Sequence, residues 1–414
     1  MLKELCSTSD SEIDDFVGLR FENSVPKVIF PRGYQLPQDD DEAREDIVNL
    51  ISTIRKFTSR YEGQKAITEF GEVDLSFPIY SYQFLIHDFL SHGYYNETEV
   101  QYQKSLKGKT NWKRTIQNEQ PHIDNNNVVY LNFIVKSART KENSLISKIH
   151  EFCIYESFKQ IGWLYSSLMP KKPVVKLNKP MFLSILNSEM NSTFDSRKKT
   201  MFNCMINVIN HADIINEKKQ DNSFGVMKFE YLWENLIDYV FGEDNIDNFF
   251  PHASWHIIND KNQRVESSAL QPDTIMSYDD KIFILDAKYY KYGITHNPMH
   301  LPASSSIQKQ ITYGEYIEQL SVTHQNTIFN AFIMPFNCKV NKCKIYRLVS
   351  IGTADWKKYN LNTQNYNYVL GILLDTKHII STYSRKNRSE INILSYLIEN
   401  SLKMYRTNEK KPEA

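Results

Sequence analysis

The chain has 414 residues, 41% of them hydrophobic and 24% charged, and this length predicts two or three folded domains. The 49 Lys and Arg residues balance the 49 Asp and Glu residues, which excludes a uniformly basic coat for nucleic acid. Five cysteines form no paired framework, no apolar run reaches the roughly 20 residues of a membrane span, and no secretory signal opens the chain. These features predict a cytoplasmic protein with reduced thiols and no membrane partner.

Charge is distributed unevenly along the chain. Residues 1–50 contain 5 Lys or Arg against 12 Asp or Glu, whereas residues 101–200 contain 17 against 7. A basic middle third is suited to follow a phosphate backbone, although solvated helix faces give the same composition. The candidate DNA-binding residues in this third are Lys107, Lys109, Lys113 and Arg114.

The first half of the chain predicts a mixture of helices and strands. An acidic run at 39–42 introduces a helix around 47–54, because carboxylates favour a helix N-terminus. A strand is expected over 128–135 and an amphipathic helix over 144–164. Prolines among lysines at 168–180 indicate a linker, and two further helices end near Asn210.

The second half predicts an α/β pattern. Its first element is a helix over 229–241 that ends at Gly242. The expected strands lie at 252–258, 268–276, 281–289, 328–335, 344–351 and 367–374, with helices near 306–320 and 389–405.

Two apolar runs on either side of residues 277–280 predict an antiparallel hairpin. Side chains alternate faces along a strand, so Asp286 and Lys288 share one face. With a loop of four residues Asp273 lies opposite Ile284, and with only Asp279 and Asp280 in the turn it lies opposite Asp286. Both loops place Asp273 on the same face as Asp286 and Lys288.

A single face of this apolar hairpin carries two carboxylates and one ammonium group. Buried charges are unfavourable unless they are paired or bind a metal, so this cluster indicates either a salt bridge or a metal site. Mg²⁺ accepts carboxylate oxygens and keeps several waters, and it can activate a water for attack on a phosphodiester. Lys288 would orient that water and stabilise negative charge. The simpler interpretation is a cross-strand salt bridge.

The hairpin resembles the active site of the PD-(D/E)XK nuclease superfamily, with Gln271-Pro272-Asp273 followed by Asp286-Ala287-Lys288. The resemblance implies Asp273 and Asp286 as metal ligands, and Lys288 as a catalytic residue. It also implies a further acid on a preceding helix, Glu234 with Glu230 as rival, as a ligand or water-orienting group. A glutamine on a following helix, Gln310 with Gln308 as rival, completes the implied site.

Further blocks at 108–116, 149–164, 231–234 and 309–316 look like the LlaJI-type restriction endonucleases, which extends the likeness over about 100–320. This resemblance implies site-specific cleavage of double-stranded DNA with Mg²⁺, for which Mn²⁺ can substitute, and a cognate DNA methyltransferase. A related subunit in that family works beside a McrB-like GTPase, as McrC does. Cutting both strands needs two sites or two passes, so a homodimer on DNA is expected.

Together these features predict an α/β protein with a C-terminal PD-(D/E)XK mixed sheet flanked by helices. The expected divisions are a mixed α+β DNA-binding domain at 1–175, a helical connector at 176–220 and a nuclease domain at 221–414. Two rival functions are a McrC-like subunit that cuts only with a GTPase partner, and a DNA-binding module with an inactive nuclease fold.

Three weaker motifs are set aside. Gly108-Lys109-Thr110 lacks the first glycine and the buried strand of a phosphate-binding loop. His252 and His256 share a predicted strand at a separation too great for one zinc ion. Cys338 and Cys343 lack a second ligand pair, so they are expected to pack rather than to bind zinc.

Overall fold

The computed structural model divides the chain into two compact units, unit 1 with residues 1–76 and 221–414 and unit 2 with residues 77–220. It describes residues 2–10, 15–22, 25–60, 73–124, 127–140, 144–218, 222–244, 246–258, 263–320, 327–339, 347–355, 364–383 and 388–409. The predicted boundary at 220 coincides with the start of the second part of unit 1. The predicted boundary at 175 does not coincide with a division, because residues 1–76 belong with the C-terminal part.

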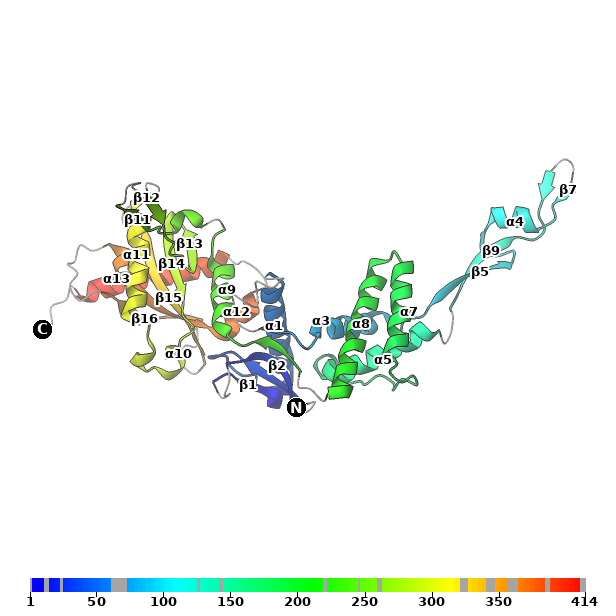
Figure 1. The fold of residues 1–414 in the computed structure, drawn as a ribbon, viewed down its shortest axis with the longest axis horizontal. Helices are drawn as coiled ribbons and strands as arrows, with labels where there is room; N and C mark the ends of the chain where they lie inside the picture. Colours follow the sequence, from blue (N-terminus) through cyan, green and yellow to red (C-terminus); the bar gives the residue numbers. More distant parts are fainter. Residues whose placement is uncertain are drawn as a thin grey trace. The chain divides into compact units, whose positions relative to one another are not determined.

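The larger sheet of unit 1 is mixed, with β13 and β14 antiparallel, β14, β15 and β17 parallel, and β16 antiparallel to β17 (Figure 1). In spatial order its strands are β13 (Thr274–Tyr278), β14 (Lys281–Ala287), β15 (Ile328–Phe336), β17 (Val369–Asp375) and β16 (Leu348–Ala354). All nine residues of β15 are buried, as expected for a central strand of a parallel segment.

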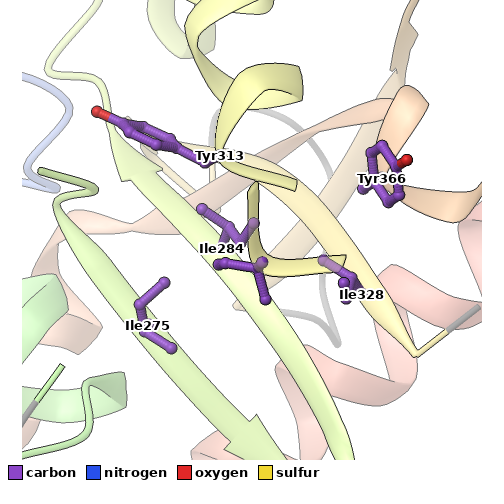
Figure 2. Close-up of a cluster of buried hydrophobic side chains, with 6 residues drawn as sticks. Ile275, Ile284, Tyr313, Ile328 and Tyr366 are labelled. Carbon is purple, nitrogen blue, oxygen red and sulfur yellow. The ribbon is translucent and has the colours of Figure 1, made fainter. Parts of the chain in front are cut away.

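Helices cover this sheet and bury its apolar side chains. The contacting helices are α9 (Phe229–Phe241), the short α10 (Tyr292–Thr295), α11 (Ser304–Gln319), α12 (Thr376–Thr382) and α13 (Arg388–Glu409). Figure 2 shows Tyr313 of α11 with Ile275 and Ile284 of the hairpin in one buried cluster. Helix α9 ends as predicted, with the Gly242 N–H donating to the Asp238 carbonyl at 2.7 Å. The prediction of an α/β second half is therefore confirmed.

A second mixed sheet explains why the first 76 residues belong to unit 1. Its strands in spatial order are β1 (Cys6–Thr8), β3 (Val25–Phe30), β2 (Val17–Glu22), β10 (Asn222–Val226) and β4 (Val73–Asp74). Strand β10, from the start of the second segment, lies between β2 and β4 and hydrogen-bonds to both. Helix α1 (Asp40–Arg60), predicted from its acidic start, packs against this sheet and against α12.

Short elements complete unit 1. They are the 3-10 turns η1 (Leu2–Leu5), η3 (Asp247–Phe249), η4 (Pro298–His300) and η5 (Asn365–Asn367), the short helix α10 (Tyr292–Thr295), and the two-stranded sheet of β11 (Ser254–Ile257) and β12 (Gln263–Glu266). The predicted strand at 268–276 is wrong in its first half. Pro272 has no N–H for a ladder, and the strand begins only at Thr274.

Unit 2 combines a helical part with two small sheets. Its helices are α3 (Ile79–His92), α4 (Trp112–Asn118), α5 (Leu145–Ser157), the π-helical turn η2 (Phe158–Gly162), α6 (Trp163–Tyr165), α7 (Lys179–Ser192) and α8 (Ser196–Lys218). The predicted helix over 144–164 is confirmed apart from its π turn. Residues 166–178 form no helix or strand, but the predicted linker at 168–180 lies inside unit 2 and its last two residues belong to α7. Helix α8 continues past the predicted end near Asn210.

The three-stranded sheet of unit 2 consists of β5 (Thr98–Lys104), β9 (Ile134–Thr140) and β6 (Lys109–Thr110). This sheet, together with the loop before β6 and helix α4 after it, is named the basic sheet here. A separate pair is formed by β7 (His122–Asp124) and β8 (Asn127–Val129). The predicted single strand over 128–135 is therefore wrong. Its apolar run is split between the end of β8, where Val128 is exposed, and the start of β9, where Val135 is buried.

Candidate active site

The hairpin of β13 and β14 has the tight two-residue turn, which decides between the two predicted registers. Tyr278 pairs with Lys281, so only Asp279 and Asp280 form the turn, with φ of 52° and 58°. Two positive φ values are typical of a type I′ turn, whose twist matches that of the strands. The register pairs Thr274 with Leu285, and one residue earlier it brings Asp273 opposite Asp286.

Asp273 lies one residue before β13, so the strand ladder alone does not hold it. Its Oδ2 accepts a hydrogen bond from the Ala287 N–H at 3.0 Å. The hydroxyl of Tyr313 donates to the carbonyl oxygen of Gln271 at 2.8 Å, which attaches the preceding loop to α11. Helix and neighbouring strand together therefore hold the carboxylate at the end of the hairpin.

Asp286 and Lys288 lie at the end of the second strand of the hairpin, β14. Asp286 is the penultimate residue of β14 and only 4% exposed, with the Lys288 Nζ 2.9 Å from its Oδ2 and 3.0 Å from its Oδ1. The Lys288 N–H donates to the Ile333 carbonyl at 2.9 Å, which continues the link to β15 beyond the last strand residue. The prediction that Asp286 and Lys288 share a face is thus consistent with their direct contact.

The electrostatics of the site reflect crowded negative charge. Burial, and after it the neighbouring Asp286 and Glu234, raise the pKa of Asp273 from 3.8 to about 8, and Lys288 opposes them. Burial tends to lower the pKa of Lys288, but Asp286 and Asp273 outweigh it, and the net pKa lies above the ordinary value. A group that binds here must therefore supply positive charge for both carboxylates to be ionised together.

Of the two predicted acids on α9, Glu234 interacts with the hairpin. Burial raises the pKa of the Glu234 carboxyl, Lys288 lowers it, and Asp286 and Glu230 raise it again. Helix α9 is held beside the hairpin by its buried Trp233, whose Nε1 donates to the Ile333 carbonyl at 3.2 Å. The residue next to Trp233 is therefore placed within electrostatic range of the aspartates.

Of the two predicted glutamines on α11, Gln310 is 1% exposed and Gln308 is exposed. Among the residues that the structure describes, no hydrogen-bond partner reaches either atom of the Gln310 side-chain amide. Such an amide is costly unless a ligand or water completes it. The buried glutamine is thus the stronger of the two candidates.

Sequence reasoning missed two residues of α11 that act on this site. Burial and both aspartates raise the pKa of the Tyr313 hydroxyl. Lys309 lowers the pKa of the Glu234 carboxyl. The Lys309 ammonium also lies 5.6 Å from the Tyr313 ring centroid. Their spacing of four residues, which puts both on one face of a helix, was the available signal.

The two carboxylates can hold a divalent metal ion, but the protein supplies no third carboxylate, histidine or cysteine ligand among the described residues. Within the described ranges, no three His, Cys, Asp or Glu side chains gather closely enough to hold a metal, so Glu234 does not join the aspartates in such a cluster. Two carboxylates with waters and substrate oxygens as further ligands suit Mg²⁺, which keeps much of its hydration.

The predicted DNA-binding residues all belong to unit 2. Lys107, Lys109, Lys113 and Arg114 are exposed on the loop before β6, on β6 itself and on α4. The guanidinium of Arg114 lies 4.0 Å from the Tyr102 ring centroid on β5. Gly108, with φ of 127°, leads into β6, and no phosphate-binding loop is formed there.

Among the described residues, the histidine and cysteine motifs that were set aside belong to no cluster of three possible metal ligands. His252 and His256 are both exposed, and His256 lies in β11. Cys338 packs at the edge of a buried cluster with Phe336 and Met334, and Cys343 lies outside the described residues.

A mixed α/β unit that carries a paired carboxylate site beside a lysine is compatible with a hydrolase acting on phosphate esters. A model of the LlaJI restriction endonuclease family matches residues 16–362, and the chain therefore belongs to that family. This membership supports a nuclease. No helix in the described part of the chain is long and apolar enough to cross a membrane.

Two other comparisons add little. No curated protein matches the chain. One of the matching solved structures, an assembly of Thermococcus gammatolerans McrB AAA+ hexamers with bound McrC, has 13% sequence identity and a TM-score of 0.36, over 92% of this chain and 83% of that one. Values this low establish neither a shared fold nor a shared activity.

Proposed function

We propose that the chain is a Mg²⁺-dependent, site-specific endodeoxyribonuclease of restriction type, with a PD-(D/E)XK active site in unit 1. The observation that carries the proposal is that the Asp273 carboxylate, bonded to the Ala287 N–H at 3.0 Å, interacts with Asp286, whose carboxylate pairs with Lys288 at 2.9 Å. Family membership is the independent support. Mn²⁺ is expected to substitute for Mg²⁺.

In this mechanism the two aspartates hold the ion. When bound, Mg²⁺ supplies the positive charge that polarises a phosphodiester and favours ionised water. The Lys288 ammonium orients the attacking water and stabilises negative charge that develops on the phosphate. Glu234 orients the water or holds a second ion, and the Gln310 amide steadies the water or a phosphate oxygen.

The cations of the basic sheet, Lys107, Lys109, Lys113 and Arg114, bind the DNA backbone in the proposed complex. Their exposure leaves them accessible to a ligand. The system would contain a cognate methyltransferase in the cytoplasm, and a homodimer would cut the two strands.

The test incubates unmethylated plasmid with purified protein and either MgCl₂ or EDTA. Wild type with Mg²⁺ is expected to yield discrete fragments, and EDTA to abolish them. Asp286→Asn should be inactive, whereas Asp279→Asn, which changes an exposed carboxylate at the turn of the same hairpin, should cut normally. Equal cutting by wild type and Asp286→Asn would exclude the aspartate pair from the mechanism.

The same experiment separates the two rival functions. A McrC-like subunit would cut only after a GTPase partner and GTP were added, and Asp286→Asn would remain inactive in that mixture. An inactive nuclease fold would bind the plasmid in a gel-shift measurement but cut it in neither mixture.

A further inference from the structure

A cavity of about 270 Å³ lies in unit 1 directly after the candidate active site. Residues 289–291, which follow Lys288, form one side, and residues 299–301 form the other. Arg32 contributes the remaining wall. The volume lies just below the roughly 300–1,000 Å³ of pockets for drug-sized ligands, so the cavity can hold part of a nucleotide, such as its base.

Arg32 is held in place by Tyr289, and its positive charge is paired with two aspartates. The Arg32 N–H donates to the Tyr289 hydroxyl at 2.6 Å, and its guanidinium lies 5.1 Å from the Tyr289 ring centroid. The same guanidinium pairs with Asp10 at 3.0 Å and Asp15 at 3.4 Å. Arg32 therefore shapes the cavity rather than providing an unpaired charge for a ligand.

The side formed by residues 289–291 is attached to the sheet through its neighbours in the chain. Gly293 packs so closely on β15 that a Cβ at this position would overlap the carbonyl oxygen of Pro335. The Lys288 N–H is bonded to the Ile333 carbonyl on the same strand, at 2.9 Å. These contacts hold the Arg32 side and the 289–291 side in place before a ligand binds, which lowers the entropic cost of binding.

The groups left available in the cavity are aromatic, apolar and cationic. Among the described residues, no carboxylate lies within ion-pair distance of Lys291, which is exposed. The Tyr290 side chain is exposed, and so are Met299, at 86%, and Leu301. A ring and apolar side chains beside an ammonium match a nucleobase joined to a phosphate.

The cavity follows directly on Lys288 along the chain. Tyr290 lies two residues after Lys288, and the Tyr290 N–H donates to the Lys288 carbonyl at 2.8 Å. The Tyr290 hydroxyl is also close enough to act electrostatically on the Lys288 ammonium. A ligand in the cavity would therefore neighbour a phosphate held at Lys288.

We propose that this cavity binds one nucleotide of the DNA strand beside the scissile phosphodiester, with its base against the Tyr290 ring and its phosphate on Lys291. The inference rests on the proposed nuclease function and adds to it a subsite outside the metal-binding pair. It predicts that contacts at this subsite position the strand, whereas the aspartates and Lys288 carry out the chemistry.

The first measurement maps contacts independently of cleavage. DNA fragments substituted with 5-bromodeoxyuridine are irradiated with the full-length protein in Ca²⁺, and the crosslinked peptides are identified by mass spectrometry. We expect crosslinks within residues 289–301. Crosslinks that spare this segment would overturn the proposal. A crosslink to free 8-azidoadenosine monophosphate but not to the DNA would assign the cavity to free nucleotides and would also overturn it.

The second measurement uses cleavage kinetics. Tyr290→Ala should lower kcat/KM for plasmid by about tenfold through loss of stacking, and Tyr290→Phe should remain near wild type. Lys291→Ala should raise KM more than it lowers kcat. The matched controls Tyr396→Ala and Lys403→Ala, on exposed positions of α13, should change neither constant.

The outcomes separate this inference from the proposed function. If wild type cuts DNA but Tyr290→Ala is unaffected, the subsite is wrong and the nuclease stands. If Tyr290→Phe loses as much activity as Tyr290→Ala, the hydroxyl acts through Lys288 and the stacking role is wrong. If neither wild type nor any variant cuts DNA under any condition, the nuclease proposal fails. Crosslinks at 289–301 would then still show that this segment contacts a nucleotide.

Discussion

The hairpin of unit 1 and the basic sheet of unit 2 differ in which side chains they bury and which they expose. The hairpin buries charge: Asp286 is 4% exposed and its ion pair lies within a sheet of apolar strands. The basic sheet exposes apolar and aromatic groups among cations, with Trp112 of α4 at 56%. Buried charge is costly without a counter-ion, whereas exposed rings with cations gain when a ligand covers them. On the proposed function, we expect the first region to carry out the chemistry and the second to bind DNA.

The largest expected effect separates catalysis from binding at the hairpin. Lys288→Met keeps the side-chain stem but removes the ammonium, and we expect kcat to fall about 100- to 1,000-fold. Plasmid binding in a gel shift should be nearly unchanged. Lys281→Met, at the other end of β14 where the lysine pairs with Glu399 at 3.0 Å, is the control and should retain activity. Comparable losses in both variants would mean general damage to the strand.

The complementary change is made in the basic sheet. Replacing Lys113 and Arg114 by alanine should weaken DNA binding and reduce the slope of log affinity against log salt by about 1 for each lost phosphate contact. Turnover at saturating DNA should be kept. Lys176→Ala, an exposed lysine of the loop before α7, is the control. An unchanged salt slope in the double variant would contradict the binding role of the sheet.

A smaller effect tests how the hairpin depends on α11. Tyr313→Phe removes the hydrogen bond to Gln271 and keeps the ring in its buried cluster. Loss of one such bond, about 1 kcal/mol, should raise the Mg²⁺ concentration for half-maximal cleavage about fivefold. Tyr366→Phe, in the same cluster but bonded to Glu318 at 2.6 Å, should leave the Mg²⁺ requirement unchanged (Figure 2).

The smallest effect concerns stability. The pKa of Asp273 is raised to about 8 in the folded protein, against 3.8 ordinarily, so its stabilising protonation is complete below pH 4 and is lost as the pH rises through 8. Asp273→Asn imitates the protonated form and should melt a few °C above wild type at pH 8 without metal, at roughly 2–4 °C per kcal/mol. The difference should shrink toward pH 4.

Added Mg²⁺ should make wild type melt above the variant, because Mg²⁺ stabilises wild type by binding to its folded state. The variant has lost one of the two carboxylates that would bind the ion. Differential scanning fluorimetry at pH 5 and pH 8, with and without Mg²⁺, measures both effects. A variant that is less stable than wild type at pH 8 without metal would mean that the carboxylates are not crowded.

The local parts of the site were predictable because they depend on neighbours in the chain. Turn residues Asp279 and Asp280 and the two-residue alternation of β14 determine which side chains share a face, and all lie within 16 residues of Asp273. The end of α9 at Gly242 is equally local. The interpretation of 128–135 as one strand failed because an apolar run records preference for extended structure and does not tell whether one strand or two contains it.

By itself the sequence determined the hairpin, its acidic pair with Lys288, the α/β pattern of the second half and the resemblance to the restriction endonucleases. Only the tertiary structure decided that residues 1–76 join the C-terminal unit, that Tyr313 holds the loop before Asp273, and that Arg32 closes a cavity against Tyr289. Tyr313 and Gln271 are 42 residues apart, and Arg32 and Tyr289 are 257 apart. Contacts over such separations leave no periodic signal in the chain, because they arise from the packing of elements and not from the conformation of any one of them.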